Sequence, residues 1–373
     1  GFTAKYNIYF NAHESFRKGV QKISNTYTDD FSELLRVFEN SDRSTASLVS
    51  SDMDIAIQKA SKLISLKSIT ARPEIDSRKD LTENEKALLE MKEFNEWVDD
   101  SYFLIGKARF YKHEFSEAES VFNHCITEAN DPLIRIESAI WLARINCERD
   151  DYSEAARLLR ETVPEPGSPK ALMAFYQMTL ADMFIRQKRY GEAIEPLNDA
   201  LGLTSGKRSE YRLTYLLAQL YERTGDSQGA ISNYRKVVKM NPPYEVEFNA
   251  RINIAGVFDV NSGNPAEILK ELEKMLKDSK NYDFRDQIYF AIGNLMKKEG
   301  REEEALEYYR KSAAAVSGNR NQKSRSYLAL AEHWYAIPDY IRAGIYYDST
   351  VYFLGKRLKG SKNYDFRDQI YFA

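Results

Sequence analysis

The side chains that most often carry catalysis or metal binding are few in this sequence and lie far apart. Its four histidines, His13, His113, His124 and His333, fall in no HExxH or comparable metal-binding spacing. His124 and Cys125 are adjacent, so they point in different directions from one helix. No glycine-rich phosphate loop, GxSxG motif or paired-carboxylate pattern rises above chance. We therefore expect no catalytic residue, no metal ion and no cofactor.

The two cysteines, Cys125 and Cys147, are too few for a disulfide framework. The first falls where the second helix of a repeat is expected to pack, and the second falls on the following helix. Two buried thiols are the favoured interpretation, and a disulfide in an oxidising compartment is the alternative.

Polar side chains suited to holding a peptide recur near a small residue in successive repeats. If the first helices of the repeats line a groove, asparagine and glutamine can bind the backbone of a partner segment, and arginine and lysine its carboxylates. The alternative is a solvated inner face. Both charge signs occur, which argues against an all-basic clamp for acidic C-termini. The candidate protein-binding residues are Lys107, Arg144, Asp182, Arg212, Tyr215, Gln219, Glu222, Asn294, Lys297, Glu332 and Tyr335.

These candidates belong to a repeated pattern. The phrase FSEAESVF at 115–122 returns six times along the chain, at intervals of 36 to 39 residues. Self-similarity at this period is typical of a solenoid, whose work is binding rather than chemistry. Each copy contains an alanine: Ala118, Ala155, Ala193, Ala230, Ala266, Ala305 and Ala343.

Each repeat reads as two helices. In residues 99–132, Tyr102, Ile105 and Phe110 lie on one helical face, and a second helix follows a short turn. Gly106 is small because the two helices are expected to approach closely there. The order of an aromatic residue, Leu-Gly or Leu-Ala, Tyr or Phe, Ala and then Pro resembles the tetratricopeptide repeat (TPR). The resemblance implies an all-α fold, a right-handed superhelical solenoid of stacked helix pairs.

Composition limits the kinds of partner. The chain has 373 residues, with 53 basic and 56 acidic side chains and a net charge of -3. Such a balance has no polybasic signature, so nucleic acid and anionic membrane surfaces are not expected partners. There is also no apolar run long enough for a transmembrane helix. Partners are expected to be proteins, with no small-molecule substrate.

Residues 1–98 differ from the repeats and predict an N-terminal helical capping region. Helical spacing of apolar residues occurs at 6–23 and again at 51–66. Between them, residues 26–50 have mixed character, and we interpret them as a long insertion in a split repeat. Loops of this length often contact another surface. Residues 67–80 read as a linker.

A helix expected at 83–97 then leads into a TPR array at 99–373, with about seven repeats. The phrase SKNYDFRDQIYFA occurs at 279–291 and again, unchanged, at 361–373. The second copy predicts that the last repeat is truncated inside its first helix. A recent duplication and a feature of the sequence as given are both open as explanations of the copy.

Three N-terminal phrases carry a narrower resemblance. TAKYNIYFNAHESFRKG, DMDIAIQKASKLISLKSI and NEWVDDSYFLIGKARFYKHEFSEA resemble the start of the PorW/SprE family, and RDQIYFA is similar to that family's repeats. The resemblance implies a TPR lipoprotein of the type IX secretion and gliding-motility apparatus, on the periplasmic side of the outer membrane. Ring and translocon proteins are the implied partners. The implied membrane attachment is through an N-terminal lipidated cysteine that this chain does not contain.

The resemblance implies no catalytic residues, so the expected function is a non-enzymatic scaffold. We expect the groove and the 26–50 insertion to hold other components in fixed geometry. The alternatives are a generic TPR adaptor, such as a chaperone partner, and a recruitment module of a cell-wall enzyme.

Overall fold

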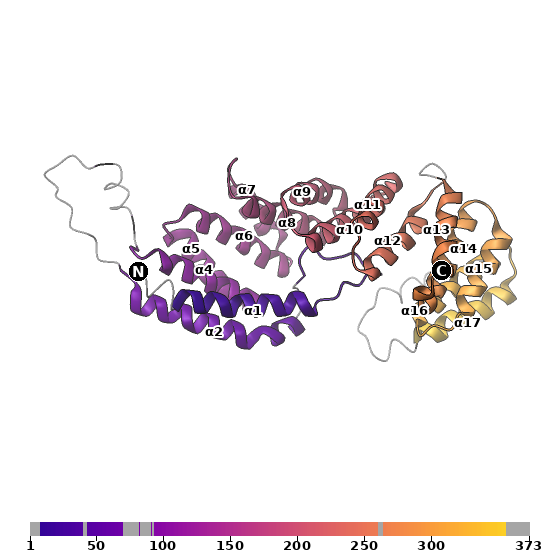
Figure 1. Ribbon diagram of the computed structural model, residues 1–373, viewed down its shortest axis with the longest axis horizontal. Coiled ribbons are helices and arrows are strands. Elements are labelled where there is room, and N and C mark those ends of the chain that lie inside the picture. The colour runs from indigo at the N-terminus through magenta and orange to yellow at the C-terminus, as the bar shows by residue number, and fades with distance from the viewer. Residues whose placement is uncertain are drawn as a thin grey trace. The chain divides into compact units, whose positions relative to one another are not determined.

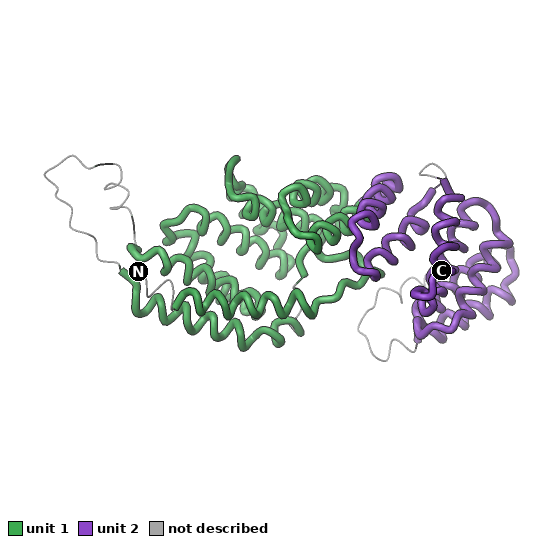
Figure 2. The backbone as a smooth tube through the Cα atoms, viewed as in Figure 1, with its two compact units in different colours: residues 1–220 green, residues 221–373 purple. Residues whose placement is uncertain are grey.

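The computed structural model describes residues 8–39, 43–69, 82, 91, 93–259 and 264–355. Every regular element among them is a helix (Figure 1). The chain divides into two compact units, residues 1–220 and residues 221–373 (Figure 2). Most of the predicted linker, most of the helix expected at 83–97 and the second SKNYDFRDQIYFA phrase lie outside the described residues.

The first unit consists of successive helices that pack as neighbours along the chain. α4 packs on α5 and α6, α6 packs on α7 and α8, and α8 packs on α9. The last helix, α10, continues three residues past the division between the units. The bounds are α1 Phe10–Thr26, α2 Arg43–Lys67, α4 Glu96–Tyr111, α5 Phe115–Glu128, α6 Pro132–Glu148, α7 Tyr152–Glu161, α8 Lys170–Arg186, α9 Tyr190–Leu203 and α10 Lys207–Arg223.

Five of the described first helices, α4, α6, α8, α10 and α14, end in the same way. After α4, the Glu114 N–H donates to the Arg109 carbonyl at 3.0 Å and the His113 N–H donates to the Phe110 carbonyl at 2.9 Å, the two bonds of a Schellman turn. This turn needs one residue with positive φ. His113 supplies it at 59°, and the matching positions in later repeats are Asp150, Lys188, Gly225 and Gly300. The recurring turn reverses the chain and starts the second helix.

The small residues of the repeat are required by close packing, as the sequence predicts. A Cβ built on Gly106 would lie 2.7 Å from Cε1 of the buried Phe122 ring on α5. A Cβ on Gly293 would lie 2.7 Å from Cε1 of Tyr309, at the equivalent place in the second unit. No real Cβ makes contacts this short, so a larger residue would push the two helices apart.

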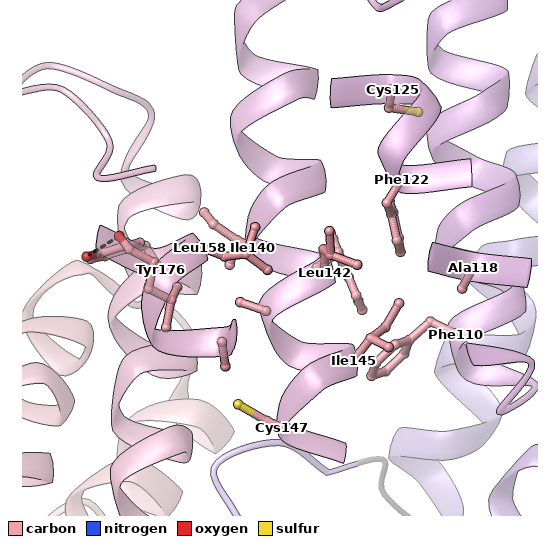
Figure 3. Close-up of a cluster of buried hydrophobic side chains, with 14 of the residues drawn as sticks. Phe110, Ala118, Phe122, Cys125, Ile140, Leu142, Ile145, Cys147, Leu158 and Tyr176 are labelled. Carbon is pink, nitrogen blue, oxygen red and sulfur yellow. Dashed lines mark hydrogen bonds between the residues drawn. The ribbon is translucent and has the colours of Figure 1, made fainter. Parts of the chain in front are cut away.

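The centre of the first unit is one buried apolar cluster built from α4 to α8 (Figure 3). Phe110, Phe122 and Trp141 pack their rings within it, with 5.0 Å between the centroids of Phe110 and Trp141. Cys125 and Cys147 are both buried free thiols at separate places in the cluster. Burial raises the pKa of each thiol to about 12, which keeps both protonated and unreactive.

Two N-terminal helices complete the first unit. α1 packs along α2, and α2 packs along α4. Ile23, Val49, Met53 and Ala108 bring these three helices together in one buried cluster. The chain between α1 and α2 is not helical over residues 27–39, and in Figure 1 this indigo coil leaves α1 and runs beside α10.

The second unit repeats the arrangement. α12, α14 and α16 pack side by side, and each packs on the helix that follows it in the chain. A short 3₁₀ helix precedes α14. The bounds are α11 Ser227–Lys239, α12 Tyr244–Val257, α13 Pro265–Lys277, η2 Ser279–Phe284, α14 Arg285–Lys298, α15 Glu302–Ala314, α16 Arg320–Ala336 and α17 Tyr340–Gly355.

Among the described helices, none is both long enough and apolar enough to cross a bilayer.

Candidate functional site

The predicted binding residues of α10 contact the chain's own residues 27–39, hereafter the internal segment. Arg212 donates to both carboxylate oxygens of Asp29 at 2.7 Å and to the Arg36 carbonyl at 3.0 Å. The two side chains of the pair are only 6% and 8% exposed. Burial alone would lower the pKa of Arg212, but the hydrogen bonds and charge of Asp29 outweigh it, and the pKa is raised. Arg212 therefore makes a bidentate contact with Asp29.

Gln219, two helical turns after Arg212 on α10, binds the backbone of the internal segment. Its amide oxygen accepts from the Leu35 N–H at 2.9 Å, and its amide nitrogen donates to the Glu33 carbonyl at 2.8 Å. Both atoms of the side-chain amide are thus used on one short stretch of main chain. Leu35 itself is buried. This is the way asparagine and glutamine were expected to bind a peptide.

Aromatic contacts hold the internal segment at Phe31 and at Phe38. Phe31 meets the ring of Tyr215 edge-on, with 5.0 Å between centroids. Further along, Phe38 lies under the Arg144 guanidinium, 3.7 Å from ring centroid to Cζ, and edge-on to Phe175 of α8. Contacts of these types favour ring over non-ring side chains at both places. The internal segment therefore lies across α6, α8 and α10.

We define the inner face as the side chains of these helices that contact the internal segment: Arg144, Phe175, Arg208, Arg212, Tyr215 and Gln219.

At the edge of the inner face, the side chains are more exposed to solvent. Arg208 pairs with Glu39 at 2.8 Å, with side chains 44% and 23% exposed, and also donates to the Tyr27 carbonyl at 3.5 Å. A hollow of about 250 Å³ remains beside it, lined by α1, the internal segment, Tyr111, Met178 and α10. The internal segment thus covers the inner face, and this hollow lies beside it.

Two other candidates of the first unit contact side chains of their own helix. The Lys107 amine lies 4.0 Å from the centroid of Phe103 and 5.6 Å from that of Phe16, and burial lowers the pKa of this lysine. Asp182 accepts from Arg186 at 2.9 Å, and Arg186 also pairs with Glu148. Of these contacts, the Arg186–Glu148 pair joins consecutive repeats, from α8 to α6.

The candidates of the second unit are more open. The Glu222 carboxylate accepts from the Tyr234 hydroxyl at 3.0 Å, and the Asn294 carbonyl accepts from the Tyr309 hydroxyl at 2.8 Å. Lys297, Glu332 and Tyr335 have exposed side chains. They lie on adjacent helices, α14 and α16.

The sequence predicts a groove that faces a partner, and in the first unit the chain's own internal segment lies against these residues. Tyr215, expected to face a partner, is fully buried, in contact with Phe31. The reason is tertiary: the 26–50 insertion was recognised, but nothing in its pattern says that it folds back onto α10, 183 residues away. Residues missed at this site are Asp29, Phe31, Leu35, Phe38, Phe175 and Arg208. The insertion contains these acidic and aromatic residues, but their spacing does not identify α10 as their partner.

Within the described parts of the chain, no three histidine, cysteine, aspartate or glutamate side chains cluster closely enough to hold a metal ion.

A family model described as "Tetratricopeptide repeat" matches residues 211–244 and 286–315. These two stretches run from α10 to the start of α12 and from α14 to the residue after α15. Together with the helix pairs and their small-residue packing, the match confirms the predicted all-α fold of TPR type. No curated protein sequence matches the chain.

Solved structures similar to the chain include the apo form of RapI, with 12% identity, a TM-score of 0.47, and coverage of 73% of this chain and 80% of that one. The C-terminal part of a TPR repeat-containing protein from Cytophaga hutchinsonii is 11% identical, with a TM-score of 0.45 and coverage of 86% and 100%. A tetratricopeptide repeat protein from Parabacteroides merdae is 11% identical, with a TM-score of 0.37 and coverage of 83% and 96%.

Proposed function

We propose that this chain, whose fold is the tetratricopeptide-repeat solenoid, is a non-enzymatic scaffold that holds other proteins. The observation that carries the proposal is the way α10 holds a non-helical stretch of polypeptide. Arg212 binds a carboxylate and Gln219 binds main-chain N–H and C=O groups, all within one buried face. These are the contacts by which helical repeats bind a segment of another protein.

We further propose that the scaffold belongs to the type IX secretion machinery at the periplasmic face of the outer membrane. The support is the resemblance of the three N-terminal phrases to the PorW/SprE family. In this role the chain holds ring and translocon proteins relative to one another. A repeat array suits such a task because it presents a long preformed surface and loses little conformational freedom on binding.

Mild cross-linking of the full-length protein in native cell envelopes, followed by affinity capture and mass spectrometry, tests this proposal. Recovery of outer-membrane secretion components is the expected result. Recovery of cytosolic proteins or chaperones alone would contradict the secretion role and leave a generic TPR adaptor.

A paired variant locates the capture surface in the second unit. Lys297→Glu with Glu332→Lys changes two exposed side chains on first helices, so folding should be unchanged and capture reduced. Arg310→Glu, an exposed change on the second helix α15, is the matched control. Equal capture by all three proteins would place the partners elsewhere on the chain.

A further inference from the structure

The backbone of the internal segment is held in a manner that does not depend on its sequence. Side chains of α10 bond to the main chain at Leu35, Glu33 and Arg36, and more loosely at Tyr27. Every one of these bonds involves a peptide N–H or C=O group, which any polypeptide offers. The inner face can therefore form the same bonds with a segment of another protein.

The sequence-dependent contacts define which segment would fit. A carboxylate at Asp29 meets Arg212, and an aromatic ring two residues later, at Phe31, meets Tyr215. The preference is thus for an acidic side chain followed, after one residue, by an aromatic one. Bidentate arginine–carboxylate pairing sets the register of such a segment, because a shift of one residue would break both bonds.

The helices on either side do not need the internal segment in order to pack. α1 and α2 are joined by the buried cluster of Ile23, Val49 and Met53. They are also joined by an ion pair at 2.5 Å between Lys22 and Asp52. Release of residues 27–39 from the inner face would leave these contacts in place.

We propose that the internal segment is a built-in ligand, and that a segment of another protein with the acid–x–aromatic pattern replaces it on the inner face. The inference rests on the proposed scaffold function, and it specifies which kind of peptide segment the first unit binds. Because the internal segment is joined at both ends to this unit, it competes at high effective concentration. The unmodified protein therefore binds the partner segment weakly, and any change that frees the internal segment strengthens binding.

A labelled synthetic peptide with the sequence of residues 26–39 is the probe. The triple variant Asp29→Ala, Phe31→Ala, Phe38→Ala, which frees the inner face, should bind this peptide at least about tenfold more tightly than the unmodified chain, because the tethered competitor is removed. Adding Gln219→Ala to the triple variant should abolish the gain. Equal affinity of the unmodified chain and the triple variant would overturn the proposal.

Matched peptides test the pattern itself. A peptide with Asp29→Ala should lose binding to the triple variant, whereas one with Asp30→Ala should retain it, since the Asp30 carboxylate accepts from Ser32 of its own segment. Equal loss with both peptides would mean general charge attraction and would refute the acid–x–aromatic specificity.

Hydrogen exchange on the unmodified protein gives a test that needs no variant. The Leu35 N–H, bonded to Gln219, should exchange through local opening, at least about tenfold faster than the amides of α10. Exchange of Leu35 only together with α10 would make the internal segment a permanent part of the fold and would overturn the proposal even if the triple variant failed to fold.

The molecular mass in solution tests one alternative, in which the segment on the inner face comes from a second copy of the chain. A dimer that becomes a monomer in the triple variant would mean that the occupant is the segment of a second copy, which would overturn replacement by a different protein. The cell-envelope capture is an independent readout. Failed peptide binding with successful capture rejects only this inference, whereas successful peptide binding with failed capture rejects the secretion role.

Discussion

In several first helices of both units, the residue after the small glycine or alanine is polar, but its surroundings differ. In the first unit, Arg144 and Gln219 are buried against the internal segment. In the second unit, the equivalent Asn294 accepts from a tyrosine of its own repeat, and Glu332 is exposed. The same repeat position is thus a filled binding contact in one unit and an open surface in the other.

This difference shows that the position of a residue in the repeat determines the direction in which its side chain points. Residues outside the repeat determine what that side chain contacts. The repeat fixes which way Gln219 and Glu332 point from their helices. The insertion between α1 and α2 then makes one of them a buried contact. Changes in the first unit should therefore cost more than matched changes at exposed positions.

The largest effect is expected from Arg212→Ala. It leaves the Asp29 carboxylate buried without its cation, and should lower the free energy of unfolding of the first unit by about 3 kcal/mol, with the loss limited by release of the internal segment. Arg208→Ala, which removes the exposed pair with Glu39, should cost less than about 1 kcal/mol.

Urea unfolding followed by tryptophan fluorescence in a Trp334→Phe background reports on the first unit, because the other two tryptophans lie there. Similar losses for the Arg212 and Arg208 variants would contradict the contrast between the buried and exposed pairs.

Glycine substitutions test whether the two units share one packing rule. Gly106→Ala and Gly293→Ala should each destabilise their own unit by about 1–3 kcal/mol, because the added Cβ meets a ring at 2.7 Å. Gly202→Ala and Gly344→Ala, with open space around the new Cβ, should stabilise by about 0.5–1 kcal/mol through helix propensity. Thermal unfolding by circular dichroism measures all four. A harmless Gly106→Ala would refute the close helix contact.

Asp100 should give the first unit a pH dependence. Burial, reinforced by the charge of Asp131, raises the pKa of Asp100 from 3.8 to about 6. The folded state therefore binds the proton more tightly than the unfolded chain, so the free energy of unfolding falls as pH rises from 4 to 6. Asp100→Asn should be about 2 kcal/mol more stable than the unmodified chain at neutral pH and no more stable below both pKa values. Urea unfolding as a function of pH checks this, and a gain that persists at low pH would point to another cause.

The smallest effect is expected at the Schellman turns. Lys188 has a φ of 60°, whereas the equivalent residue of the second unit is Gly300. Lys188→Gly should stabilise the first unit by about 0.5–1 kcal/mol, and Gly300→Ala should destabilise the second by about 1 kcal/mol. Thermal unfolding of the two variants, each against the unmodified chain, gives the signs. Two shifts of the same sign would be inconsistent with a shared turn geometry.

The fold was predictable because its signals are local. Ala118 and Gly106 recur with their repeat, and a close helix contact leaves few other residues at those places. The contents of the inner face were not predictable from such signals. Asp29 and Arg212 are 183 residues apart in the sequence, and no periodic pattern around either residue identifies the other as its partner. The open candidates of the second unit, such as Tyr335, remain predictions.

The path of the internal segment changes how the first unit should respond to unfolding and to force. In a plain stack of helix pairs each pair contacts only its neighbours, so the ends can fray one pair at a time. Residues 27–39 connect the first helix of this unit to its last, in parallel with the stack. Tension along the unit should therefore load the Arg212–Asp29 contact before the helix pairs separate, so release of the internal segment should be the first step of forced unfolding.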